Sequence, residues 1–218
     1  MLAVQARRVR KMAQVLPEPK GARTGTAGSG APFSLLIVGD SSAAGVGAQT
    51  QDEALSGQLA HLLSQRFSIS WQLEACTGYA TQDAFEQLLT IKPQIFDCAV
   101  IALGVNDVTQ ATTKAGFKRK QAQLWSLLQT RFSVGKILSA GVPQMQHFPL
   151  LPRPLSWVLG QQAARLDRGL AELAANTPST THIPMRFPQD PMLAASDGFH
   201  PSPAAYAQWA ATLVDHIR

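Results

Sequence analysis

An aspartate and a histidine stand three positions apart in the last loop of the sequence, which reads Ser196-Asp-Gly-Phe-His-Pro-Ser202. At this spacing the Asp197 carboxylate can accept a hydrogen bond from Nδ1 of His200. Such a bond orients the ring and leaves Nε2 free to take a proton from a hydroxyl group. The same spacing also occurs in loops without a catalytic role, so the pair alone indicates only a candidate general base.

A hydroxyl group that such a base could activate lies in the segment Gly39-Asp-Ser-Ser-Ala-Ala-Gly45. Its small residues allow a sharp turn, and the helix that follows directs its unpaired amide groups toward that turn. Three interpretations fit Ser41: a phosphate-binding loop, a capped helix start with no further role, and a nucleophile. The phosphate-binding loop is the weakest, because neither G-x-x-x-x-G-K-[ST] nor G-x-G-x-x-G occurs in this segment.

Two further loops offer hydrogen-bond donors. Gly78 presents a backbone amide with no side chain beside it, although an ordinary turn glycine has the same appearance. Asn106 offers a side-chain NH2 group, although an Asx turn or a helix cap would use the same residue. We interpret the adjacent Asp107 as a turn or capping carboxylate rather than as a third catalytic acid. Together the four loops supply the nucleophile, base, orienting carboxylate and oxyanion donors of an acyl-transfer site.

The apolar pattern predicts the elements that must bring these loops together. Short β-like runs alternate with longer helical stretches, which is typical of a parallel α/β sheet. Because the carboxyl ends of parallel strands lie at one edge of the sheet, a doubly wound three-layer α/β/α sandwich would gather the four loops there. The expected strands are 33–38, 68–76, 96–103, 134–140 and 180–185, and the expected helices are 55–67, 82–91, 112–131, 155–176 and 202–218.

The four blocks resemble, in order and spacing, those of the SGNH (GDSL) hydrolase family. The resemblance covers about residues 33–218 and implies a flavodoxin-like fold with a five-stranded parallel sheet. It also implies a serine esterase that needs no metal or other cofactor. The blocks are Gly39-Asp-Ser41, Gly78, Gly104-Val-Asn-Asp107 and Asp197-Gly-Phe-His-Pro201.

The resemblance also implies roles for individual residues. Ser41 would be the nucleophile, His200 the base, and Asp197 the carboxylate that holds the imidazole. The backbone amides of Ser41 and Gly78 and the side chain of Asn106 would form the oxyanion hole. The sequence departs from the family pattern in two places: a serine stands where a leucine often follows the nucleophile, and the usual asparagine shortly before the second-block glycine is absent.

The segment 143–159, which follows the fourth expected strand, is long, apolar and stiffened by prolines. It is either an acyl-binding wall or a loop packed on the core. An ester with a short to medium acyl chain, including a lipid or a lysophospholipid, fits such a wall. A carbohydrate O-acetyl esterase and a non-catalytic ligand-binding module are the alternatives. The expected substrate-binding residues are Asp40, Met145, Phe148, Trp157 and Phe199.

The net charge of +5 comes from the start of the chain, because residues 1–23 carry six basic side chains and one acidic one. The rest of the chain is neutral, which argues against a nucleic-acid partner. We interpret residues 1–32 as a basic arm with a Pro/Gly/Ser linker and residues 33–218 as the hydrolase domain. The arm is either a solvated tail or a short helix that contacts an anionic membrane peripherally. The sequence favours a cytoplasmic location, with the inner face of a membrane as the alternative.

Overall fold

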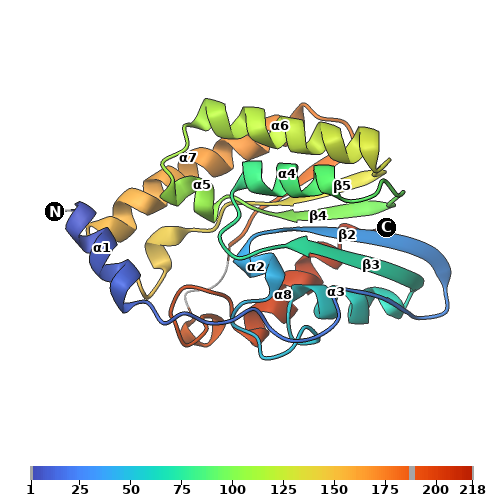
Figure 1. Ribbon diagram of the computed structural model, residues 1–218, viewed down its shortest axis with the longest axis horizontal. Coiled ribbons are helices and arrows are strands. Elements are labelled where there is room, and N and C mark those ends of the chain that lie inside the picture. The colour runs from blue at the N-terminus through green and yellow to red at the C-terminus, as the bar shows by residue number, and fades with distance from the viewer. Residues whose placement is uncertain (1, 187–189, 218) are drawn as a thin grey trace.

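A six-stranded sheet forms the middle layer of the computed structural model, which describes residues 2–186 and 190–217 (Figure 1). The strand order is β1-β3-β2-β4-β5-β6; the five strands β2 to β6 run parallel to one another, and β1 is antiparallel to β3. The five predicted parallel strands are therefore confirmed. The strands are β1 (Thr24–Ala27), β2 (Ala31–Gly39), β3 (Phe67–Ala75), β4 (Cys98–Ala102), β5 (Lys136–Ala140) and β6 (Thr180–Ile183).

Helices cover both faces of the sheet, which confirms the predicted three-layer sandwich (Figure 1). One face carries α4 (Thr81–Thr90), α5 (Val105–Thr109), α6 (Lys114–Arg131) and α7 (Leu155–Ala175). The other carries α2 (Ser41–Ala44), α3 (Leu55–Ser64) and α8 (Pro203–Val214). Among the described residues, no helix combines the length and apolar character needed to cross a membrane. Met1 and Arg218, at the ends of the predicted arm and of the predicted last helix, lie outside the described residues.

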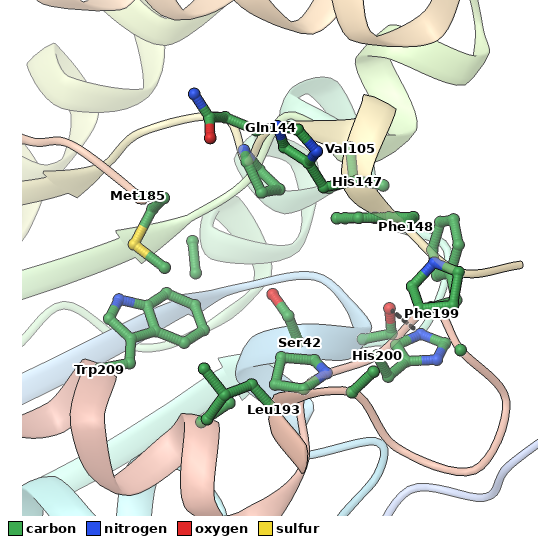
Figure 2. A pocket seen from close by; sticks show the side chains of 18 of the residues that line it. Ser42, Val105, Gln144, His147, Phe148, Met185, Leu193, Phe199, His200 and Trp209 are labelled. Carbon is green, nitrogen blue, oxygen red and sulfur yellow. Dashed lines mark hydrogen bonds between the residues drawn. The ribbon is translucent and has the colours of Figure 1, made fainter. Parts of the chain in front are cut away.

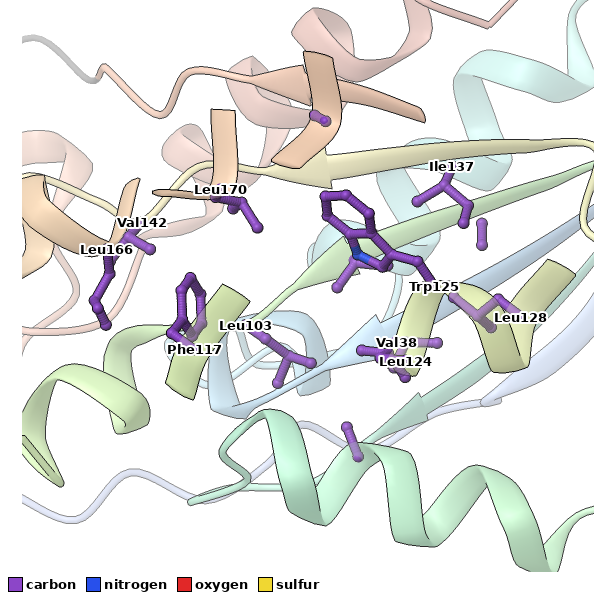
Figure 3. Packing of buried hydrophobic residues seen from close by; sticks show 14 of the residues in the cluster. Val38, Leu103, Phe117, Leu124, Trp125, Leu128, Ile137, Val142, Leu166 and Leu170 are labelled. Carbon is purple, nitrogen blue, oxygen red and sulfur yellow. The ribbon is translucent and has the colours of Figure 1, made fainter. Parts of the chain in front are cut away.

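Two apolar clusters hold the layers together, one on each face of the sheet. Successive residues of a strand point to opposite faces, so Leu36 and Val38 of β2 enter one cluster and Leu35 and Ile37 enter the other. All five residues of β4 are buried, because this central strand is covered on both sides. Figure 3 shows the cluster under α6 and α7, where the fully enclosed ring of Trp125 packs beside the sheet.

The interpretation of residues 1–32 as an arm and a linker is wrong at its C-terminal end. Thr24–Ala27 form β1, which pairs antiparallel with β3, the outermost of the five parallel strands, and Ala31 and Pro32 already belong to β2. Pairing with an edge strand satisfies backbone groups whatever the side chains are, so a polar, glycine-containing segment can form a strand. Gly25 also lets the Trp71 ring lie against the backbone, because a Cβ at this position would fall 2.4 Å from the ring.

The start of the chain forms helix α1 (Leu2–Met12), which lies against α7. Ala6 and Val9 pack against the apolar cluster on that face, and Nε2 of Gln5 donates a hydrogen bond to the Arg153 carbonyl at 2.9 Å. One side of α1 is therefore packed within the protein, whereas Leu2 and Met12 at its ends are exposed. Peripheral contact with an anionic membrane stays a prediction, and it would fall to the exposed basic side chains Arg7, Arg8 and Lys11.

Candidate active site

The register of the sheet brings three of the four predicted loops together. Gly39, the last residue of β2, pairs with Ala75 of β3 on one side and with Ala102 of β4 on the other. Ser41, Gly78 and Asn106 follow these three strand ends within a few residues. Gly39 has to be glycine at this point, because a Cβ would lie 2.6 Å from the Ala102 carbonyl oxygen.

The turn after β2 presents Ser41 at the first position of the short helix α2. Asp40 caps this helix: its Oδ1 accepts hydrogen bonds from the Ser42 amide at 2.9 Å and from the Ser42 hydroxyl at 2.7 Å. The amide of Ser41 has no acceptor within the helix, because it belongs to the first turn. The sequence interpretations of Ser41 as a helix start and as a nucleophile are therefore compatible, because the half-buried serine lies at the capped start of α2. Burial raises the pKa of Asp40 to about 6, although the bonds from Ser42 favour the ionised form.

Ser41, His200 and Asp197 form a continuous chain of hydrogen bonds. The Oγ atom of Ser41 lies 2.9 Å from Nε2 of His200, and Nδ1 of His200 lies 2.5 Å from Oδ2 of Asp197. Figure 2 marks the hydrogen bond at the His200 ring with a dashed line. The two loops are 159 positions apart in sequence, and the fold brings them into direct contact at the predicted edge of the sheet.

The Asp197 carboxylate also shapes its own loop. Its Oδ1 accepts hydrogen bonds from the amides of Phe199 at 2.9 Å and His200 at 3.0 Å, and Gly198 between them adopts a φ of +65°. Burial alone would favour the neutral acid, but the hydrogen bonds from His200 and Phe199 outweigh it and hold the pKa of Asp197 below its ordinary value. Asp197 is therefore ionised at neutral pH and keeps the imidazole in one orientation.

The two remaining predicted donors lie in neighbouring loops that are tied together. Nδ2 of Asn106 donates a hydrogen bond to the Tyr79 carbonyl at 2.9 Å, which leaves the second N–H of the same group for another acceptor. Gly78 adopts a φ of +90°, and a Cβ there would have no atom within 4 Å. The Gly78 backbone therefore faces open space beside the Asn106 loop.

Asp107 is confirmed as a capping carboxylate. Its Oδ2 accepts hydrogen bonds from the amide of Thr81 at 3.0 Å and from the Thr81 hydroxyl at 2.8 Å, at the first residue of α4. Burial raises the pKa of Asp107 and outweighs the Thr81 bonds, which favour the charged form. This buried contact joins the loop of Asn106 to the loop that follows β3, and so fixes the two loops relative to each other.

A cavity of about 470 Å³ opens beside Ser41 and His200. In Figure 2, Ser42 lies between two sets of side chains that line it. On one side Trp209, Met185 and Leu193 form what we call the apolar chamber; their side chains are only 4%, 9% and 8% exposed. On the other side the wall contains Phe148 and Phe199, whose rings meet edge to face at 5.0 Å beside His200.

The structure places three of the five predicted substrate-binding residues at this cavity and two elsewhere. Asp40, Phe148 and Phe199 line it. Met145 is fully buried in the core, in the 3₁₀ turn η1 (Met145–His147). Trp157 is 61% exposed on α7, because Leu155 and Ser156 on the same turn take the inward positions. These two assignments are wrong, since a long apolar loop does not reveal which of its side chains turn toward the sheet.

No sequence pattern predicts the apolar chamber. Trp209 lies in the expected last helix, 202–218, and its position nine residues after His200 carries no separate signal. Met185 follows the end of β6, so the rule that parallel strands end at the catalytic edge could have identified it. Leu193 lies in the 3₁₀ turn η2 (Pro191–Leu193), whose placement depends on the fold of the whole loop.

Comparisons with known proteins agree with this fold. The family model described as the GDSL-like Lipase/Acylhydrolase family matches residues 37–208, which include Ser41 and His200. A GDSL-like esterase from Mycobacterium tuberculosis is 25% identical over 190 residues, which make up 81% of this chain and 59% of that esterase. The chain thus spans little more than half the length of this relative.

Solved structures share the fold at low sequence identity. A lipase/acylhydrolase from Enterococcus faecalis has a TM-score of 0.67 and 17% identity, with 85% of this chain and 95% of that chain covered. An inhibitor-bound aryl esterase from M. smegmatis has a TM-score of 0.63 and 18% identity, with 85% and 98% covered. These likenesses concern the fold. The family match, which extends over most of the sequence, shows that the chain belongs to the GDSL-like lipase/acylhydrolase family.

Proposed function

We propose that the protein is a serine esterase that hydrolyses carboxylic esters with short to medium acyl chains through an acyl-enzyme. The observation that carries this proposal is the unbroken hydrogen-bond chain from Ser41 through His200 to Asp197 at the wall of a cavity, in a chain of the acylhydrolase family. A non-catalytic binding module would have no use for a buried, ionised carboxylate that orients an imidazole toward a hydroxyl.

The proposed reaction begins when Nε2 of His200 takes the proton of Ser41 as Oγ attacks the ester carbonyl carbon. The new C–O bond forms while the carbonyl electron pair moves onto oxygen, and Asp197 stabilises the imidazolium. Collapse of the tetrahedral intermediate breaks the bond to the alcohol, which leaves with the proton from His200. Water then repeats the sequence on the acyl-enzyme and restores Ser41.

The negative charge on the tetrahedral oxygen needs donors that are already in place. The amides of Ser41 and Gly78 and the free N–H of Asn106 supply them in this proposal. Support comes from the sheet register, which places the three loops on adjacent strands, and from the bond between Asn106 and the Tyr79 carbonyl, which orients the amide group.

The apolar chamber is the proposed site of the acyl chain. Its residues are buried and line the same cavity as Ser41, so an acyl chain that enters it leaves water almost completely. Burial of one CH2 group contributes about 0.8 kcal/mol, which corresponds to a roughly fourfold gain in kcat/KM for each carbon that the chamber accepts. The volume of the whole cavity, about 470 Å³, lies in the lower part of the range for small-molecule sites.

We predict that kcat/KM for p-nitrophenyl esters rises by about fourfold per added carbon and then falls once the chamber is full. Trp209→Ala lengthens the chamber and should move the optimum to longer acyl chains, whereas Leu193→Phe fills it and should move the optimum to shorter ones. Trp157→Ala is the matched control, because it removes the same side chain from an exposed position outside the cavity. The measurement is the initial rate of hydrolysis over the ester series for the wild type and the three variants.

An optimum that stays in place in both chamber variants would contradict the assignment of the chamber. A wild-type optimum at acetate that neither variant moves would favour an O-acetyl esterase, which acts on the shortest acyl group. A shift caused by Trp157→Ala would show that the acyl chain lies along α7 instead.

A further inference from the structure

The segment 17–23, which we call the N-terminal strap, runs from α1 past the loops that carry Ser41 and Gly78 (Figure 1). The Lys20 carbonyl accepts a hydrogen bond from the Gln51 amide at 2.9 Å, in the connection between α2 and α3. Pro19 packs against the end of α2, where a Cβ added to Gly45 would lie 2.8 Å from its Cγ atom. The strap therefore packs against the loops that follow Ser41, although it does not line the cavity. The family match begins at residue 37 and does not include it.

One ion pair of the strap holds the loop that leads to Gly78. Oε1 of Glu18 accepts hydrogen bonds from the Thr77 amide at 2.7 Å and from the Thr77 hydroxyl at 2.8 Å. Oε2 of Glu18 accepts a hydrogen bond from Nη1 of Arg23 at 3.0 Å, and Nη2 of Arg23 donates to the Ala75 carbonyl. The pair is thus hydrogen-bonded both to the end of β3 and to Thr77, the residue that directly precedes Gly78.

The other side of Gly78 is held by the catalytic loop itself. Nδ2 of Asn106 donates to the Tyr79 carbonyl, and the Tyr79 amide donates to the Cys76 carbonyl at 3.2 Å. Gly78 has no side chain and lies beside open space, so packing does not fix the direction of its amide. That direction is set by its two neighbours, of which Thr77 is held by Glu18.

We propose that Glu18, supported by Arg23, is a positioning residue that fixes the Gly78 amide in the oxyanion hole. This inference rests on the proposed esterase function. Both side chains of the ion pair are about one-third exposed, at 37% and 30%, so their mutual attraction contributes little by itself. The directional bonds to Thr77 and Ala75 carry the effect.

Glu18 remains charged under ordinary assay conditions. Partial burial favours the neutral acid, but the hydrogen bonds from Thr77 and the positive charge of Arg23 outweigh it and hold the pKa of Glu18 below its ordinary value. The variant Glu18→Gln keeps an oxygen that can accept from Thr77 and loses the charge that pairs with Arg23. Glu18→Ala loses both interactions.

The test compares kcat and KM of the full-length wild type, Glu18→Ala, Glu18→Gln and Glu53→Ala with one p-nitrophenyl ester. Glu53 is the matched control, because its Oε2 also accepts from a backbone amide, that of Gln49 at 3.1 Å, in a loop that does not contain Gly78. We expect Glu18→Ala to lower kcat by about 10- to 100-fold, since loss of a whole oxyanion donor costs about 10²–10³. KM should change by less than about twofold, because the donor acts on the transition state. Glu18→Gln should fall between Glu18→Ala and the wild type.

Hydrogen exchange of the peptide that covers residues 76–79 provides a second readout that does not depend on turnover. Exchange should be faster in Glu18→Ala and unchanged in Glu53→Ala. The positioning role would be overturned if the wild type is active and Glu18→Ala keeps the wild-type kcat, or loses no more of it than Glu53→Ala does. Either result would leave the esterase proposal standing. Wild-type turnover no greater than that of Ser41→Ala would instead refute the esterase proposal, and the positioning role with it.

Discussion

Replacing Ser41 with alanine is expected to lower kcat for ester hydrolysis by about 10⁴- to 10⁶-fold, as loss of the nucleophile does in serine hydrolases. The Oγ atom is the only part of Ser41 that reaches Nε2 of His200, at 2.9 Å, and alanine leaves the backbone amide of residue 41 in place. The variant should therefore fold normally and still bind ester. Steady-state rates with a p-nitrophenyl ester, together with thermal unfolding, measure the effect.

Ser42→Ala is the matched control for this prediction. The Ser42 hydroxyl faces the same cavity, but it donates to Oδ1 of Asp40 at 2.7 Å, and the imidazole of His200 contacts Ser41 instead. Its loss should lower kcat by less than about tenfold, since it weakens only one cap interaction. If Ser42→Ala lost ester hydrolysis while Ser41→Ala kept it, Ser42 would be the nucleophile instead.

Replacing Asp197 with asparagine is expected to lower kcat by about 10⁴-fold. The asparagine can keep the two backbone bonds to Oδ1, but its NH2 group would face Nδ1 of His200 in place of the carboxylate oxygen, which now lies at 2.5 Å. The ring would then carry its proton on Nε2 and could no longer accept the proton of Ser41. Because the ionised carboxylate acts in the transition state, the loss should appear in kcat more than in KM.

The chain offers a second Asp–His pair as the control. Oδ1 of Asp167 lies 2.8 Å from Nε2 of His182 and accepts a hydrogen bond from the Val142 amide at 2.9 Å. Asp167→Asn makes the same chemical change at a pair whose histidine is not the one that contacts Ser41, and should lower kcat by less than about tenfold. Equal losses in Asp167→Asn and Asp197→Asn would indicate that loss of a structural carboxylate, and not the orientation of His200, accounts for the effect.

The sequence predicted the parallel core and the meeting of the loops for a physical reason. Strands buried on both faces, such as β4, appear as continuous apolar runs, and parallel strands must end at one edge. The pairing of Ser41 with His200 follows from that topology. The position of Asn106 also follows, because β4 lies next to β2 in the sheet.

The features that the sequence did not predict depend on backbone pairing or on local rotation of side chains. Strand β1 is held by its backbone pairing with β3. This pairing does not require apolar side chains, so the four residues of β1 show no apolar pattern. Met145 and Trp157 differ in burial because the Met145 side chain packs into the core, whereas Trp157 lies on the outer side of α7. The contact of Glu18 with Thr77 joins residues 59 positions apart, and no local pattern predicts it.

The most direct test of the account is covalent labelling with a p-nitrophenyl phosphonate ester, followed by intact mass measurement and peptide mapping. The reagent places a tetrahedral phosphorus where the ester carbon would be attacked and releases p-nitrophenolate. We predict one phosphonyl group per chain, on Ser41, with no label on Ser41→Ala and much slower labelling of Asp197→Asn. An enzyme that hydrolyses esters but carries the label on Ser42 or on another residue would contradict the assignment of Ser41 as the nucleophile.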